Sequence, residues 1–263
     1  MYHNQGSPVK SISSRDMEKF AHDSIVPDEQ STLEKKDQVA GMFNDIAGRY
    51  DMLNRILSGG IDIIWRKKAL RELKSLHPAK ILDVATGTAD VAIMTNRLLQ
   101  PQHITGVDIS EGMLALGRKK VDDLNLGQVI TLEYGDSEQL RFEDNSFDAI
   151  TVAFGVRNFQ NLLKGLQEMY RVLRPGGKLV VLEFSKPTGM GVKQFYELYM
   201  KYAAPAAGKL LSSNQEAYEY LNNSIQAFPE GEQFLQILRN AGFSKTYLKK
   251  LSFGICTIYC GSK

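Results

Sequence analysis

Between about residue 80 and residue 184, short apolar runs alternate with segments whose apolar residues recur every three or four positions. The first pattern is typical of buried strands and the second of amphipathic helices. Strands are predicted at Lys80–Val84, His103–Val107, Val129–Tyr134, Phe147–Phe154 and Lys178–Phe184. The helices between them are predicted at Val91–Leu99, Gly112–Val121 and Asn161–Leu173. This alternation indicates a mostly parallel sheet with helices on both faces.

The chain after Phe184 departs from the alternation. Two strand-like segments, FSKTYLKKL and GICTIYCG, meet at a Ser-Phe-Gly connection, which is typical of a β-hairpin. We therefore expect an α/β domain with a seven-stranded, doubly wound, mostly parallel sheet and an antiparallel C-terminal strand. Residues 188–240 are longer than a simple crossover needs, so we expect a helical insertion that covers the substrate as a lid.

Residues 1–36 are polar and weakly periodic, and we expect them to form a mobile tail before a domain at 37–263. Residues 37–76 have a helical pattern. In its second helix the residues expected on the buried face are Ile61, Ile64, Trp65, Ala69, Leu73 and Leu76. The residues expected in solvent are Arg66, Lys67, Arg71 and Lys74. Solvation explains this basic face, with contact to an anionic membrane as the sharper alternative.

Composition gives little support to several classes of function. A net charge of +2 gives no support for a nucleic-acid partner. Cys256 and Cys260 are too few for a disulfide scaffold and fit no zinc or redox spacing, so we expect them to fill space and find no metal site. The chain has neither a membrane-length apolar run nor a signal-peptide core, which predicts a cytoplasmic protein. A peripheral membrane contact and a homo-oligomer stay open.

The stretch KILDVATGTAD, residues 80–90, leads a buried strand through small residues into a helix. Such a loop makes a ligand crevice at the edge of an open α/β sheet. The glycine positions of a dinucleotide loop, which must approach a pyrophosphate, fall on Ala85, Gly87 and Asp90. Two glycines are missing, and the Asp90 carboxylate would repel phosphate. A ligand with an ammonium group and no phosphate fits better, which favours S-adenosylmethionine.

Acidic residues follow the next two predicted strands. Asp108, about 25 residues beyond Asp83, can accept hydrogen bonds from both ribose hydroxyls. Asp136 can accept from an adenine amino group, and the backbone of Ser137 can donate to the ring. Each of these residues could merely cap a helix or turn. All of them follow the carboxyl end of a strand, which favours the nucleoside interpretation.

From Val39 to Lys263 the chain resembles the ubiquinone/menaquinone biosynthesis C-methyltransferases, the UbiE family. The resemblance rests on RYDMLN, LDVATGTAD, FGVRN, RVLRPGGKLVVLEFSKP and YLNNSIQAFP. It implies a class I S-adenosylmethionine-dependent methyltransferase fold, with cofactor positions at Gly87, Thr88, Asp108, Asp136 and Ser137. The chain departs from the family where Gly-Gly-Thr-Gly becomes Thr-Gly-Thr-Ala and Asn-Ala becomes Asp-Ser. Ala89 adds a methyl group where the helix begins, which could change the affinity for the cofactor.

The resemblance further implies methylation of a ring carbon of a prenylated quinol, with demethylmenaquinol as the leading substrate. The benzoquinol of the ubiquinone pathway, another lipid-like molecule, and a non-catalytic cofactor-binding protein are the alternatives. Arg157 and Asn158 in FGVRN, with Tyr50 in RYDMLN, are the implied catalytic residues. Arg157 would stabilise a phenolate, and Tyr50 would orient the quinol. The structural alternative pairs Arg157 with a carboxylate and buries Tyr50 in the core.

Overall fold

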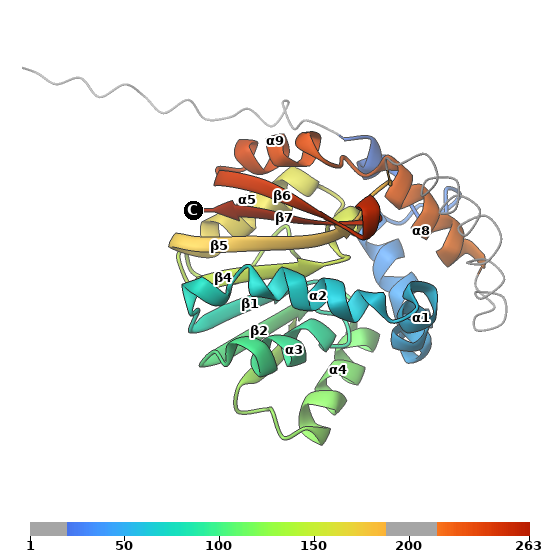
Figure 1. Cartoon of the computed structure of the whole chain (residues 1–263). Coiled ribbons are helices and arrows are strands. Elements are labelled where there is room, and N and C mark those ends of the chain that lie inside the picture. Colours follow the sequence, from blue (N-terminus) through green and yellow to red (C-terminus); the bar gives the residue numbers. More distant parts are fainter. Residues whose placement is uncertain (1–19, 188–214) are drawn as a thin grey trace, which may run out of the picture.

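The computed structural model describes residues 20–187 and 215–263, and its central feature is a seven-stranded sheet (Figure 1). The strand order is β3-β2-β1-β4-β5-β7-β6. The strands are β1 Lys80–Val84, β2 His103–Asp108, β3 Ile130–Tyr134, β4 Phe147–Ala153, β5 Leu173–Phe184, β6 Ser244–Leu251 and β7 Cys256–Ser262. The first five strands pair in parallel, and β7 runs antiparallel to both β5 and β6. The predicted fold class is therefore confirmed.

The sheet reverses its order of winding at β1, which is the geometry that opens a ligand crevice. β1 pairs with β2 on one side and with β4 on the other. Its residues Ile81 and Leu82 are fully buried because helices cover both faces of the sheet. The carboxyl ends of β1, β2 and β4 consequently share one edge, where loops from two winding directions separate.

Helices form a layer on each face of the sheet. One face packs on α2 Ile61–Arg71, α3 Asp90–Leu99 and α4 Glu111–Asp123, through residues that include Trp65, Ala92 and Leu114. The other packs on α5 Leu162–Val172 and α9 Glu232–Asn240, through residues that include Leu166 and Phe234. The long α1, Lys35–Ser58, lies across the end of the sheet where the crevice opens (Figure 1). Within 20–187 and 215–263 no helix is long and apolar enough to cross a membrane.

The predicted start of the fifth strand was wrong. β5 begins at Leu173, which pairs with Phe147, and its next registered pair is Lys178 with Ala149. The intervening Pro-Gly-Gly segment bulges out of the register, with Gly176 at a φ of 81°, which glycine adopts without strain. Cys256 and Cys260 lie fully buried in β7, as expected of residues that fill space.

The exposed face of α2 differs from the predicted one. Ile61 and Ile64, expected to be buried, are 42% and 53% exposed, whereas Arg66, expected in solvent, is 6% exposed. Arg66 is buried because it pairs with Asp62 and with Asp90. A periodic pattern predicts that an arginine is exposed to solvent, and its burial becomes evident only when its partners in the tertiary structure are known.

Part of the segment expected to be a tail, residues 1–36, contacts the domain through the buried His22 and Lys35. Ala21–Ser24 form a 3₁₀ turn, η1. The His22 ring is fully buried, stacked on Phe20 and edge-on to Phe228. Lys35 donates to the carbonyl of His22 over 2.6 Å. Residues 1–19 lie outside the described part of the chain.

The expected lid begins outside the described residues, because 188–214 are not among them. Two further helices fall within the expected insertion, α8 at Gln215–Ala227 and α9. α9 belongs to the core rather than to a lid, since it buries Phe234, Leu235, Ile237 and Leu238. The lid function stays a prediction for 188–214 and α8.

Candidate functional site

A cleft lies at the carboxyl ends of β1, β2, β3 and β4, beneath α1. It holds about 690 Å³ of space, counting its open mouth. Tyr50, Val39 and Phe43 of α1 contribute an apolar roof. The remaining lining includes Gly87, Asp108, Asp136, Ser137, Glu138, Phe154, Gly155 and Asn158. Within the described ranges, no three His, Cys, Asp or Glu side chains group as metal ligands.

The loop after β1 has a left-handed backbone at Ala85, Gly87 and Ala89, with φ values of 54°, 56° and 65°. Gly87 points its amide at Asp108 and donates to Oδ2 over 2.8 Å. The loop after β4 closes against it, since a Cβ at Gly155 would lie 2.5 Å from that of Ala85. The glycine of FGVRN is therefore required by the close approach of two backbones.

Asp108 ends β2 with its carboxylate in the cleft. Its two oxygens accept from the backbone N–H groups of Gly87 and Ser110, each over 2.8 Å. Burial raises the pKa of the carboxyl, and these hydrogen bonds oppose the rise. Each carboxylate oxygen keeps a second acceptor position, so Asp108 can receive the paired hydroxyls of a ribose while it holds the loop.

Asp136 and Ser137 follow β3 and line the same cleft. Asp136 accepts from the backbone of Glu138 over 2.9 Å through Oδ1, which fixes its turn. Its Oδ2 lies 3.6 Å from Nζ of Lys36 on α1. Asp136 and Ser137 follow the strand next to the one that Asp108 ends. They are therefore placed to contact the base of a nucleoside whose ribose is bound by Asp108. The structure brings together Gly87, Asp108, Asp136 and Ser137 as the sequence predicted.

Thr88 lies in the same loop but its side chain points elsewhere. It is 2% exposed and is not among the residues that line the cleft. Its hydroxyl donates to Asp51 of α1 over 2.6 Å and lies 3.0 Å from Nζ of Lys120. A cofactor contact of Thr88 would consequently have to use its backbone.

Asp90 does not act as the sequence suggested. Its carboxylate pairs with Arg55, Arg66 and Lys120, over 2.6, 3.2 and 2.8 Å. Burial alone would raise the pKa of Asp90, but Lys120, then Arg66 and Arg55, lower it below its ordinary value. A carboxylate so neutralised does not repel phosphate across the loop. The argument from the missing glycines is unaffected, whereas the argument from Asp90 was wrong.

The three predicted catalytic residues are divided between the cleft and the wall behind it. Tyr50 and Asn158 line the cleft, and the Tyr50 ring meets that of Phe43 edge-on at 5.8 Å. Arg157 is 5% exposed and not among the lining residues. It pairs over 2.8 Å with Glu183 of β5, which is fully buried. The structural alternative is therefore correct in pairing Arg157 with a carboxylate. It is incorrect in placing Tyr50 in the core, because Tyr50 lines the cleft.

Sequence reasoning missed two partners at this end of the cleft. Tyr220 of α8 donates to Oδ1 of Asn158 over 3.1 Å. Glu183 fixes the turn η3, Val156–Asn158, by accepting from the Arg157 guanidinium and, at 3.4 Å, from its backbone. Tyr220 and Glu183 lie in YLNNSIQAFP and RVLRPGGKLVVLEFSKP, so both stood in motifs that carry the family resemblance, but their partners are far away in the sequence and no local pattern indicates the pairing.

Comparison with known proteins gives consistent results. The model of the ubiE/COQ5 methyltransferase family matches residues 31–263. The demethylmenaquinone methyltransferase of Bacteroides fragilis is 50% identical, over 87% of this chain and 94% of that protein. The ubiquinone/menaquinone biosynthesis C-methyltransferase UbiE of Geobacter sulfurreducens is 45% identical, over 88% and 90%. A solved SAM-dependent methyltransferase from Aquifex aeolicus shares the fold, with a TM-score of 0.54 at 19% identity, over 74% and 88%.

Proposed function

Since the chain belongs to the ubiE/COQ5 methyltransferase family, we propose that it methylates a ring carbon of demethylmenaquinol, giving menaquinol. The observation that carries this proposal is the 50% identity to a demethylmenaquinone methyltransferase over 94% of that protein's length. S-adenosylmethionine is the methyl donor, as in the sequence-based interpretation. The benzoquinol of the ubiquinone pathway is the second candidate, because a relative at 45% identity is named for both quinones.

The residues that line the cleft fit this donor. Asp108 keeps acceptor capacity for ribose hydroxyls, and Asp136 offers a carboxylate oxygen to an adenine amino group. Gly87 has no side chain, so its backbone can approach the amino-acid tail. When bound, S-adenosylmethionine supplies an electrophilic methyl group on its sulfonium.

The chain's own residues then have to orient an electron-rich ring. With the methyl group supplied by the sulfonium, the ring carbon would gain that group, the electron pair of the broken carbon–sulfur bond would stay on sulfur, and the ring would release the proton of that carbon to solvent. Asn158 can donate from its amide nitrogen to a quinol oxygen, because its amide oxygen is already used by Tyr220. Tyr50 can stack on the ring or hydrogen-bond to it. Such positioning, with water kept out, supplies much of the rate in transfers of this kind.

Arg157 is assigned a lesser electrostatic part than the sequence suggested. Its charge would stabilise a phenolate at the wall of the cleft, but Glu183 lies 2.8 Å away and offsets that charge. The pair also holds the turn that carries Asn158. We therefore propose that the direct contacts to the quinol come from Asn158 and Tyr50.

A direct test compares three acceptors at equal concentration with the purified protein and S-adenosylmethionine: demethylmenaquinol, the prenylated benzoquinol and a non-quinol lipid. Methylation of demethylmenaquinol at the highest kcat/KM would support the proposal. A preference for the benzoquinol would instead assign the chain to the methylation step of the ubiquinone pathway. Turnover of the non-quinol lipid alone would overturn the assignment.

A peripheral membrane contact is also proposed, because the prenyl tail of the substrate partitions into lipid. The outer face of α2 presents exposed Ile61 and Ile64, followed by exposed Lys67, Lys68 and Arg71. Phe253, in the turn between β6 and β7, is 82% exposed. The neighbouring Ser252 accepts from the Trp65 indole over 2.8 Å, which sets Phe253 beside α2. Apolar residues beside cations suit an anionic bilayer surface.

A further inference from the structure

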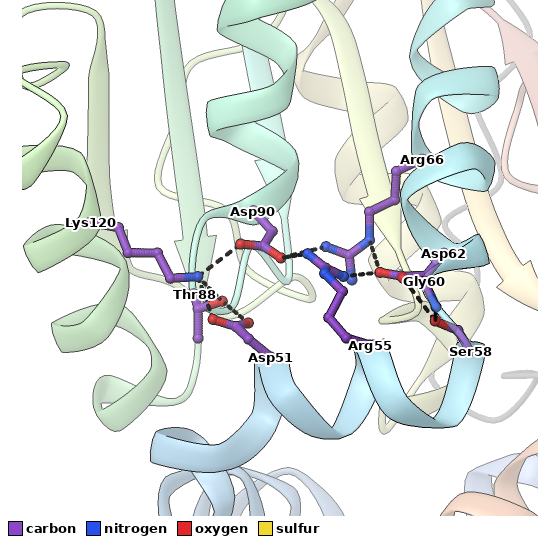
Figure 2. Close-up of polar contacts among 9 residues, drawn as sticks. All are labelled: Asp51, Arg55, Ser58, Gly60, Asp62, Arg66, Thr88, Asp90 and Lys120. Atoms are coloured by element: carbon purple, nitrogen blue, oxygen red, sulfur yellow. Dashed lines mark hydrogen bonds and ion pairs between the residues drawn. The ribbon is translucent and has the colours of Figure 1, made fainter.

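Six charged side chains from four elements meet beside the loop that follows β1 (Figure 2). They are Asp51, Arg55, Asp62, Arg66, Asp90 and Lys120. Three are acids and three are bases, so the cluster is electrically balanced. Four of them come from α1 and α2, and none lines the cleft. Their function is therefore not explained by direct contact with cofactor or substrate.

Asp90, the first residue of α3, is the centre of the cluster. Its Oδ2 receives Arg55 of α1 and Arg66 of α2, and its Oδ1 receives Lys120 of α4. Asp62 joins the two arginines from the side and is itself held by Ser58, whose hydroxyl donates over 2.8 Å. One carboxylate thus connects three helices to the start of a fourth, as Figure 2 shows.

Thr88 supplies the second attachment of the same loop. Its hydroxyl donates to Asp51, and both are bonded to Lys120. Lys120 therefore contacts the loop on either side of Ala89, once through Thr88 and once through Asp90.

Ala89 has a backbone that needs such restraint. Its φ of 65° lies in the left-handed region, where an alanine is strained, and the residue is fully buried. Strained non-glycine residues persist only where the surroundings over-determine them. Two residues earlier, the amide of Gly87 has to point at Asp108 for the cofactor site to exist.

We propose that this ion network holds the cofactor loop in its strained, binding-competent conformation, with Lys120 and Asp90 as positioning residues for S-adenosylmethionine. The network replaces the conformational freedom that a glycine at position 89 would provide. It also fixes α1, which carries Tyr50 and Phe43, relative to the loop. The proposal concerns the cofactor and is independent of which quinol is methylated.

The test measures S-adenosylmethionine affinity by calorimetry in Lys120→Met. A matched control is Lys119→Met, which removes the neighbouring lysine of α4 from an exposed pair with Asp123. We expect the dissociation constant to rise about tenfold in Lys120→Met, the size expected when one left-handed alanine relaxes, and to stay unchanged in the control. In steady-state assays the loss should appear in the KM for S-adenosylmethionine and not in that for the quinol.

Rescue separates positioning from general stabilisation. Glycine adopts a positive φ without strain, so Ala89→Gly added to Lys120→Met should restore affinity to within about threefold of Ala89→Gly alone. A general loss of packing would not be repaired in this way. If Lys120→Met fails to fold, the isosteric Asp51→Asn carries the same test. Unchanged cofactor affinity in the folded single variant, or no rescue by glycine, would overturn the proposal.

Discussion

The hydroxyl of Tyr220 lies 3.1 Å from the amide oxygen of Asn158 and donates to it, joining α8 to the wall of the cleft. Both residues are buried, at 3% and 9% exposure. The hydrogen bond fixes which end of the amide is left for a ligand. It also explains why FGVRN and YLNNSIQAFP, which are far apart in the sequence, belong to one site.

Loss of this hydrogen bond should slow the reaction without weakening the binding of the cofactor. Tyr220→Phe removes one neutral hydrogen bond, so we expect kcat/KM for the quinol to fall about 2- to 10-fold. Affinity for S-adenosylmethionine should not change. Tyr247→Phe is the control, since its hydroxyl bonds to Glu72 on the outside of the fold. Equal effects of the two substitutions would show that Tyr220 has no specific role in the site.

We expect the loss of Arg157 to act mainly through the stability of the fold rather than through a direct effect on turnover. Alanine at this position leaves Glu183 buried without its cation, which typically costs about 3–5 kcal/mol of stability. We expect a corresponding fall in the free energy of unfolding in urea, and a smaller one for Arg157→Lys. An Arg157→Ala protein of normal stability but very slow turnover would instead give the charge a direct role in catalysis.

The buried His22 makes the N-terminal segment sensitive to acid. Burial, with a smaller effect of Lys35, lowers the pKa of His22 from 6.5 to about 3. A histidine whose folded pKa lies below its unfolded value stabilises the fold fully above pH 6.5 and loses that contribution as the pH falls toward 3. The loss at about pH 5 amounts to about 2 kcal/mol.

Hydrogen exchange of residues 20–34, corrected for intrinsic rates, measures this effect. Exchange should be faster at about pH 5 than at about pH 7, and His22→Leu should remove the difference. His77→Asn is the control, because His77 is not buried and has a left-handed backbone that asparagine tolerates. Identical protection of the wild-type segment at both pH values would contradict the lowered pKa.

Vesicle flotation tests the membrane surface. We expect binding to vesicles that contain phosphatidylglycerol, weaker binding in high salt, and little to pure phosphatidylcholine. Phe253→Glu should abolish binding, whereas Leu124→Glu should not, since Leu124 is also exposed but ends α4. Binding unaffected by Phe253→Glu would move the contact to another surface.

The sequence predicted the sheet and the cofactor edge because both depend on local patterns. Short apolar runs predict the strands and a period of three to four residues predicts the helices, which places Asp108 and Asp136 at strand ends, and parallel strands bring those ends together. The predicted and observed ranges of the strands and helices agree to within a residue or two, except where the glycines of β5 bulge from the register. The apolar or acidic character of each position was sufficient.

Residues whose partners lie far along the chain could not be predicted in this way. Arg66 is buried because it pairs with Asp62 and also with Asp90, which lies 24 residues later. His22 is buried by Phe228 and by the backbone contact of Lys35, which no period in the first 36 residues reveals. Thr88 lies at a cofactor position implied by the family resemblance, yet its side chain is held away from the cleft by Asp51 and Lys120.

The central claim, transfer of a methyl group to a ring carbon in this cleft, is tested most directly with methyl-deuterated S-adenosylmethionine and demethylmenaquinol. Tandem mass spectrometry of the product locates the label on the ring or on an oxygen. The account predicts that the label is on a ring carbon, with formation much slower in Asn158→Ala although that variant binds the cofactor normally. A label on oxygen, or no labelled quinol from a protein that binds the cofactor, would contradict it.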